Sequence, residues 1–91
     1  MPRSKLELYT EILSTIAENP RTLDNIAYKC KMDCVNLSER LDFLRRNNLV
    51  EEKTHNNKQF YVLTRRGLSV SKTLSIARRL EKLQNNPSQT Q

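Results

Sequence analysis

Residues 34–67 read CVNLSERLDFLRRNNLVEEKTHNNKQFYVLTRRG, and this stretch decides the fold. Its first part carries apolar residues at spacings of three and four, the period of an amphipathic helix. These residues are Leu37, Leu41 and Leu44. Two short runs rich in valine and aromatic residues follow, on either side of a polar segment that contains Asn56 and Asn57, a pair typical of a tight turn. The stretch therefore predicts a helix that leads directly into a β-hairpin.

Two further helices are predicted before this stretch. Ser4 followed by Glu7 forms a capping box, and an apolar stripe then continues to the helix stop at Asn19-Pro20. The stripe consists of Leu6, Tyr9, Ile12, Leu13 and Ile16. Thr22 can cap a short second helix with Leu23, Ile26, Ala27 and Cys30 inward.

The turns between these elements are built without glycine. Lys31-Met32-Asp33 makes the tight turn before the third helix, and Asp33 is the natural N-cap of that helix. Asn47-Asn48 ends it, because asparagine tolerates the left-handed conformation common at helix exits. The single glycine of the chain is Gly67.

The order of elements predicts a mostly α fold with one β-hairpin, a winged helix-turn-helix. It has three helices, a two-stranded wing at 49–54 and 59–63, and a long C-terminal helix that Thr64 caps. The inward residues of the wing are expected to be Leu49, Tyr61 and Leu63. We expect a winged helix-turn-helix domain at 4–64, a dimerisation helix at 65–84 and a disordered tail at 85–91.

The composition allows one domain and favours a polyanionic partner. The chain has 91 residues, of which 36% are apolar, and a formal net charge of +6. The segment 65–84 alone carries a net +5. The N-terminal sequence lacks a signal peptide and the chain lacks a membrane-spanning stretch, so we expect a cytoplasmic, nucleoid-associated protein.

Neither a metal site nor catalysis is predicted. Cys30 and Cys34 lie four residues apart, but the only histidine, His55, lies far along the chain in the presumed wing. Two buried free thiols are therefore favoured over a zinc site. The sequence has no Ser-His-Asp set and no glycine-rich phosphate loop, so we expect no enzyme activity and no cofactor, and nothing points to a small-molecule ligand.

The last helix carries two apolar stripes. The first consists of Val70, Leu74 and Ala77, and the second of Thr73, Ile76, Leu80 and Leu83. We expect the third helix and the hairpin to cover the first stripe near Val70, which leaves the second for another copy of the chain. The alternative is a helix that folds back on the first helix and buries both stripes within the monomer.

The motifs Leu37-x3-Leu41-Asp42-Phe43-Leu44, Asn48-Leu49-Val50 and Tyr61-Val62-Leu63-Thr64-x2-Gly67 resemble a group of small archaeal winged-helix transcriptional regulators. The resemblance covers about residues 5–83. Some members of that group are abundant DNA-binding proteins that dimerise through a C-terminal antiparallel coiled coil. The resemblance implies binding of double-stranded DNA by a homodimer, either sequence-tolerant or operator-specific, without catalysis.

Winged helices place the third helix in the major groove and the wing along the flanking backbone or minor groove. On that geometry we predict a set of DNA contacts from exposed cations and short polar side chains in the third helix, the turns and the wing. The set is Arg21, Lys31, Val35, Asn36, Ser38, Arg40, His55, Asn56, Asn57, Lys58, Arg65 and Arg66.

Two carboxylates count against this interface. Glu39 and Asp42 project from the outward face of the third helix, where they would repel phosphates unless Glu39 accepts from a cytosine amine or pairs with Arg45 or Arg46. A protein-docking module that never contacts DNA is therefore the alternative function.

Overall fold

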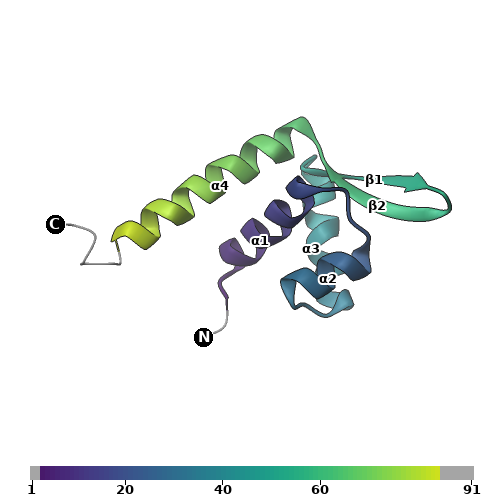
Figure 1. Cartoon of the computed structure of the whole chain (residues 1–91), viewed down its shortest axis with the longest axis horizontal. Coiled ribbons are helices and arrows are strands. Elements are labelled where there is room, and N and C mark those ends of the chain that lie inside the picture. The colour runs from purple at the N-terminus through teal and green to yellow at the C-terminus, as the bar shows by residue number, and fades with distance from the viewer. Residues whose placement is uncertain (1–2, 85–91) are drawn as a thin grey trace.

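The computed structural model describes residues 3–84 and contains the predicted elements in the predicted order (Figure 1). They are α1 (Lys5–Glu18), α2 (Leu23–Cys30), α3 (Cys34–Arg46), β1 (Val50–His55), β2 (Lys58–Leu63) and α4 (Arg65–Gln84). The prediction of a mostly helical winged fold is confirmed. The predicted tail at 85–91 lies outside the described residues. No helix in the described part of the chain is long and apolar enough to cross a membrane.

The predicted N-caps begin the first three helices. The Ser4 hydroxyl accepts from the Glu7 backbone N–H at 3.1 Å, and the Glu7 carboxylate accepts from the Ser4 backbone N–H, which completes the capping box. Thr22 and Asp33 accept in the same way from backbone N–H groups three residues further on. Each cap satisfies a backbone donor that a helix start leaves without a partner.

The hydrophobic core lies where α1, α2, α3 and the root of the wing meet. Its buried members are Ile12, Leu13, Ile16, Ile26, Ala27, Cys30, Leu37, Leu41, Leu44 and Val50. Two predictions about the core were wrong. Leu6 is 58% exposed because it lies one turn before the part of α1 that the other helices cover, and Cys34 is exposed at the start of α3.

The wing is an antiparallel hairpin with a two-residue turn. Its register pairs Val50 with Leu63 at the root and His55 with Lys58 at the tip. Asn56 and Asn57 have φ values of 51° and 64°, the left-handed pair that a type I′ hairpin turn requires. The expected inward residues Leu49, Tyr61 and Leu63 pack against the core and are partly buried, and Val50 is the fully buried residue of the first strand.

Lysine and asparagine adopt the left-handed backbone conformation at the ends of two helices. Lys31 ends α2 with φ 54°, and Asn48 follows α3 with φ 60°. The expected left-handed exit at Asn47-Asn48 is therefore confirmed at Asn48. A third strand-like segment also supports the wing, because the backbones of Arg21 and Tyr61 exchange hydrogen bonds of 3.1 and 2.7 Å.

A close backbone contact joins α4 to the root of the wing. Gly67 lies on the Leu49 carbonyl, and a Cβ added to Gly67 would stand 1.9 Å from that oxygen. The same carbonyl accepts from the Thr64 backbone N–H at 3.1 Å, and the Thr64 hydroxyl donates to the Asn48 carbonyl at 2.6 Å. Only glycine allows the first turn of α4 to approach this closely.

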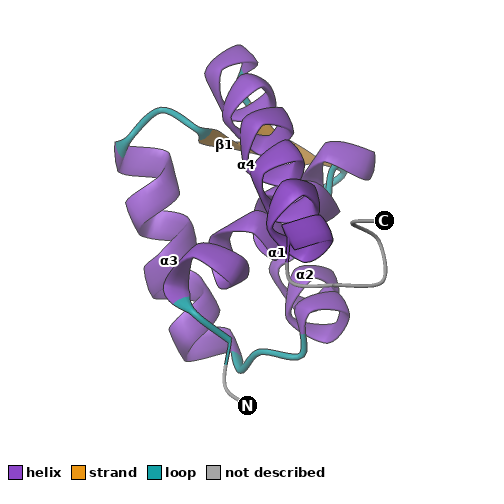
Figure 2. Cartoon of the chain, turned by 90° about the vertical axis from the view of Figure 1, so that its left-hand side faces the viewer, coloured by secondary structure: helices purple, strands orange, loops and turns teal. Residues whose placement is uncertain are grey.

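Helix α4 runs back along α1 in the opposite direction, and α3 lies away from α4 (Figures 1 and 2). Val70 and Leu74 pack against the core and Ser71 is buried. The expectation that the hairpin covers this stripe is confirmed by the contacts of β2 with α4, but the other covering element is α1 and not α3. Ala77, at the end of the stripe, is exposed.

The second stripe of α4 is not buried within the monomer. Ile76 and Leu80 are each 57% exposed, and Leu83 is 48% exposed. At 100° per residue these side chains point away from the buried Ser71, on the opposite side of the helix. The fold-back alternative, in which one chain buries both stripes, is therefore not the structure of this protein.

The contact at Gly67 generates a test of the fold. We expect Gly67→Ala to lower the free energy of unfolding by about 3 kcal/mol, because the new methyl group meets a backbone carbonyl that cannot rotate away. Chemical denaturation measures this change. Ser69→Ala, an exposed position on the same helix, is the control and should change stability by less than about 0.5 kcal/mol. Equal stability of the two variants would contradict the close approach.

Candidate nucleic-acid interface

Helix α3 has one buried face and one open face. Leu37, Leu41 and Leu44 fix the helix on the core. Its first turns expose Val35, 73% accessible, together with Asn36 and Ser38. The structure thus brings these three predicted contacts together on the open side of α3, which faces away from α1 and α4 (Figure 2).

Asp33 orients Asn36 at the start of α3. One carboxylate oxygen accepts from the Asn36 backbone N–H at 2.8 Å, and the other accepts from the Asn36 side-chain amide at 2.6 Å. These bonds, the backbone bond foremost, hold the pKa of Asp33 below its usual value. Asn36 is therefore held in one orientation, with its side-chain carbonyl and its second amide hydrogen left for a partner.

The arginines at the end of α3 pair with Asp42 and not with Glu39. Arg45 forms an ion pair with Asp42, and Arg46 Nε lies 3.3 Å from the other Asp42 oxygen. Arg45 Nε also lies 3.7 Å from Glu52 on the wing. Glu39 therefore pairs with neither Arg45 nor Arg46 among the described residues. The charge of Asp42, in contrast, is balanced by both arginines.

Arg40 packs against α1. Its guanidinium carbon lies 5.6 Å from the centre of the Tyr9 ring, and Tyr9 in turn contacts Phe43 at 5.3 Å between ring centres. This is a cation–π geometry that covers apolar surface with the arginine stem. Its Nε is buried without a hydrogen-bond partner among residues 3–84. The structure gives Arg40 a packing role, and its predicted DNA contact stays a prediction.

The Arg21 side chain also makes its hydrogen bonds within the chain. Its guanidinium donates to Asn25 Oδ1 and to Glu18 Oε1, each at 2.8 Å, and its Nε donates to the Thr15 carbonyl at 3.2 Å. The side chain is only 13% exposed. Arg21 therefore connects the end of α1 to the start of α2, and its predicted phosphate contact stays a prediction.

The remaining predicted contacts are exposed at three places. His55, Asn56, Asn57 and Lys58 form the wing tip, which projects far from the helices (Figure 1). Arg65 and Arg66 open α4 at the root of the wing. Lys31 is exposed in the turn between α2 and α3, where the Arg3 side chain donates to its carbonyl at 3.3 Å.

The sequence reasoning missed Tyr28, which is 82% exposed on α2. A tyrosine hydroxyl is a common donor to phosphate oxygens in protein–DNA complexes. The sequence did hold a signal for an exposed tyrosine, because Tyr28 is not among the residues predicted to point inward from that helix and stands next to Lys29. An aromatic residue on a solvent-facing position of a helix-turn-helix is a candidate for contact with a partner.

The cysteines form no metal centre among the described residues, where no group of His, Cys, Asp and Glu is suited to a metal ion. Cys30 lies 3.7 Å from the Thr15 hydroxyl, and burial raises the pKa of its thiol. Cys30 is a core residue, as predicted.

The chain belongs to the winged helix-turn-helix family, because a family model of that description matches residues 2–83. The DNA-binding protein Sso10a-2 from Sulfolobus solfataricus has a similar fold, with a TM-score of 0.77 and 20% identity over 88% of this chain and 83% of that chain. The transcriptional regulator BldR from the same organism gives a TM-score of 0.76 and 21% identity over 88% and 62%.

A further similar structure is the homodimeric winged helix-turn-helix DNA-binding domain of Mb0332 from Mycobacterium bovis. Its TM-score is 0.68, with 22% identity over 86% of this chain and 70% of that chain. At sequence identities this low, the similarity to these structures shows a shared fold. No curated protein matches the sequence.

The stabilising effect of the Asp33 N-cap on α3 should depend on pH. The lowered pKa of Asp33 means that the carboxylate stabilises the fold above its ordinary pKa of 3.8 and loses this effect as the pH falls through the folded value. We expect Asp33→Ala to lower the melting temperature at pH 7, and the difference from the native protein to shrink below about pH 4. Thermal unfolding at several pH values measures it. Asp24→Ala, exposed on α2, is the control. A difference that persists at pH 2 would contradict the role of the charge.

Proposed function

We propose that this protein binds double-stranded DNA as a homodimer and acts as a transcriptional regulator or chromatin-type protein. The observation that carries the proposal is the open N-terminal half of α3, whose opposite face is locked into the core while Val35, Asn36 and Ser38 face outward. A helix held rigidly from behind, with small polar and apolar side chains in front, suits the width of the major groove.

Base reading is assigned to the first turn of α3. Asn36, held by Asp33, retains a donor and an acceptor, the pair needed for adenine. Val35 suits the methyl group of thymine, and Ser38 can bond to several bases. Each good contact discriminates by about 1 to 3 kcal/mol, so a few of them give a mild sequence preference.

Backbone contacts are assigned to cations on both sides of that turn. Lys31 and Tyr28 lie on the α2 side, and the wing tip with Lys58 lies on the other. Arg65 and Arg66 extend the positive surface along α4. His55, Asn56 and Asn57 add short polar groups at the tip. Such contacts set the register of the protein on DNA without reading its sequence.

The carboxylates of α3 fit this arrangement. Asp42 is balanced by Arg45 and Arg46, so it adds little repulsion towards phosphates. Glu39 is exposed one turn after Val35, where it is placed to accept from a cytosine amine. The reading surface is therefore the N-terminal turn, and the C-terminal half of α3 contributes packing and charge balance.

The dimer interface is assigned to Thr73, Ile76, Leu80 and Leu83. Their stripe repeats at alternating spacings of three and four and lies outward on α4. Two heptads are too short for a stable isolated coiled coil, so the helices must be supported by the domain body, here through the packing of α4 on α1. On this proposal, residues 4–64 form the DNA-binding unit and 65–84 the dimerisation helix.

The wing tip provides a test of DNA binding. We expect Lys58→Ala to weaken binding to every duplex by a similar factor, about threefold to tenfold at low salt, because it removes a phosphate contact and no base contact. Fluorescence anisotropy with several unrelated duplexes measures the change. Arg78→Ala, which removes the same charge from the far end of α4, is the control. Equal losses for both variants would show that only net charge matters.

The outer stripe provides a test of assembly. We expect Leu80→Asp to convert the dimer into monomers, because two carboxylates would be buried across the symmetric contact. Sedimentation equilibrium measures the mass. Lys82→Asp introduces the same acidic side chain at an exposed position on the opposite side of α4 and should leave the dimer intact. A Leu80→Asp protein of unchanged mass would place the interface elsewhere.

A further inference from the structure

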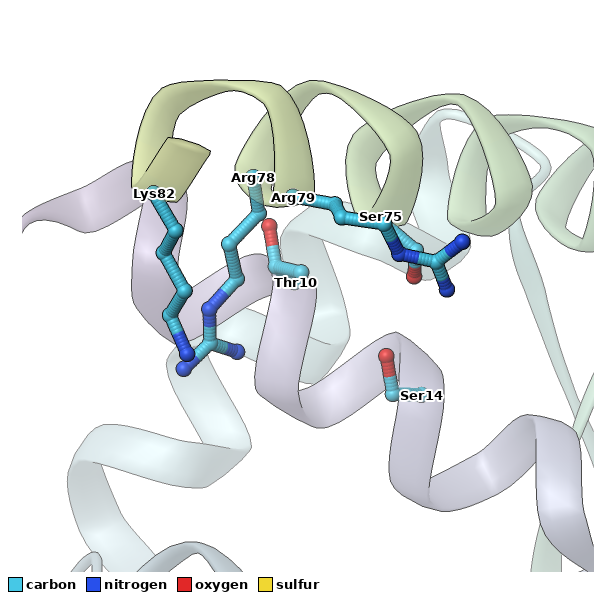
Figure 3. A pocket seen from close by; sticks show the side chains of 6 residues that line it. All are labelled: Thr10, Ser14, Ser75, Arg78, Arg79 and Lys82. Atoms are coloured by element: carbon cyan, nitrogen blue, oxygen red, sulfur yellow. The ribbon is translucent and has the colours of Figure 1, made fainter. Parts of the chain in front are cut away.

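A groove lies between α1 and α4, away from α3 and the wing. Its volume is about 380 Å³, and it is lined by Thr10, Ser14, Ser75, Arg78, Arg79 and Lys82 (Figure 3). The hydroxyl groups come from both helices, and the three cations come from α4, where Arg78 and Arg79 are adjacent and Lys82 lies one turn further on. Arg78 and Lys82 extend downward from α4 beside Thr10, and Arg79 extends towards Ser75.

In the described part of the chain, the cations of the groove form no close ion pair, although Glu7 and Glu81 border Arg78 in the adjoining hollow. Within the described residues, none of the ion pairs involves Arg78, Arg79 or Lys82. The Thr10 hydroxyl donates to the Leu6 carbonyl at 2.7 Å, so it can only accept from a partner. The hydroxyls of Ser14 and Ser75 are the donors that line the groove. Three positive charges and two hydroxyl donors thus border one hollow.

The polarity of this part of α4 is the reverse of an ordinary surface helix. Its basic residues lie on the side towards α1, and its apolar residues Ile76, Leu80 and Leu83 lie on the side away from the domain. The proposed dimer accounts for the outward apolar side. The inward basic side needs a separate explanation, because cations placed close together repel one another unless an anion lies between them.

We propose that this groove binds a compact small molecule that carries several phosphate charges. Guanidinium groups donate to phosphate oxygens through paired N–H groups, and a lysine adds a mobile point charge. The hollow lies between two helices, so a small anion reaches Ser14 and Ser75, whereas a DNA duplex is a wide convex rod that cannot enter between them. The volume of the groove is within the range of small-molecule sites.

The position of the groove gives such a ligand a regulatory role, which rests on the proposed function. An anion held by Ser14 on α1 and by Arg78 and Lys82 on α4 ties the dimerisation helix to the DNA-binding unit. In a dimer built on α4, the angle between α4 and α1 sets the distance between the two copies of α3. Binding in the groove therefore selects one spacing of the two reading helices and alters affinity for DNA.

The test uses the full-length protein and sodium tripolyphosphate at constant ionic strength. We expect the native protein to bind it, with changes in the backbone amide signals of Thr10, Ser14 and Ser75 in NMR spectra. Calorimetry should show at least tenfold weaker binding by the double variant Arg78→Gln, Lys82→Gln. The matched control, Arg65→Gln with Arg66→Gln, removes two charges from the same helix outside the groove and should bind as the native protein does.

Several outcomes would overturn the proposal. Equal losses in the two double variants would show diffuse attraction of an anion by a basic helix. Signal changes confined to α3 and the wing would place the anion at the nucleic-acid interface. Changes in the groove signals caused by a short DNA duplex and not by tripolyphosphate would make the groove part of the DNA surface.

The same variants separate this proposal from the proposed function. Without tripolyphosphate, Arg78→Gln with Lys82→Gln should bind DNA as the native protein does, and Arg65→Gln with Arg66→Gln should bind it more weakly. Absence of DNA binding by the native protein, with tripolyphosphate still bound in the groove, would reject the DNA-binding function and leave the anion site in place. DNA binding by a protein that does not bind tripolyphosphate would reject the anion site alone.

Discussion

The backbone of Asn48 and Leu49 is the point on which the rest of the structure depends. The Leu49 N–H donates to the Leu44 carbonyl at 2.9 Å, which attaches this segment to α3. The Leu49 carbonyl accepts from Thr64 and lies against Gly67, which attaches it to the start of α4. One peptide segment therefore fixes α3, the wing and α4 relative to one another. In the proposed dimer, the arrangement of the two copies of α3 would inherit its geometry from this junction.

Much of the fold could be predicted from the sequence because its signals are local. The caps at Ser4, Thr22 and Asp33 and the Asn56-Asn57 turn each act within four residues, and all four occur as predicted. The errors arose where burial depends on distant elements. The covering of α4 by α1 is set by the path that the chain takes after Thr64, which no local spacing reveals.

The candidate site was less accessible to prediction, since residue type does not reveal a side chain's partners. Arg21 and Arg40 could not be told apart in sequence from exposed candidates such as Lys58. In the structure Arg21 is held by Glu18, Asn25 and the Thr15 carbonyl, and Arg40 by the Tyr9 ring. Conversely, the groove cations of α4 lie on the side of the helix that faces α1, a fact that only the packing of the two helices supplies.

In the proposed complex, two copies of α3 and the wing contact the phosphate backbone of duplex DNA around a small reading surface. The decisive measurement is the affinity of the protein for a random-sequence duplex at several salt concentrations, with the mass of the protein determined alongside. If each half engages three or four phosphates, the logarithm of the association constant should fall against the logarithm of salt concentration with a slope of about −5 to −7. A slope near zero, or no binding at low ionic strength, would contradict the account.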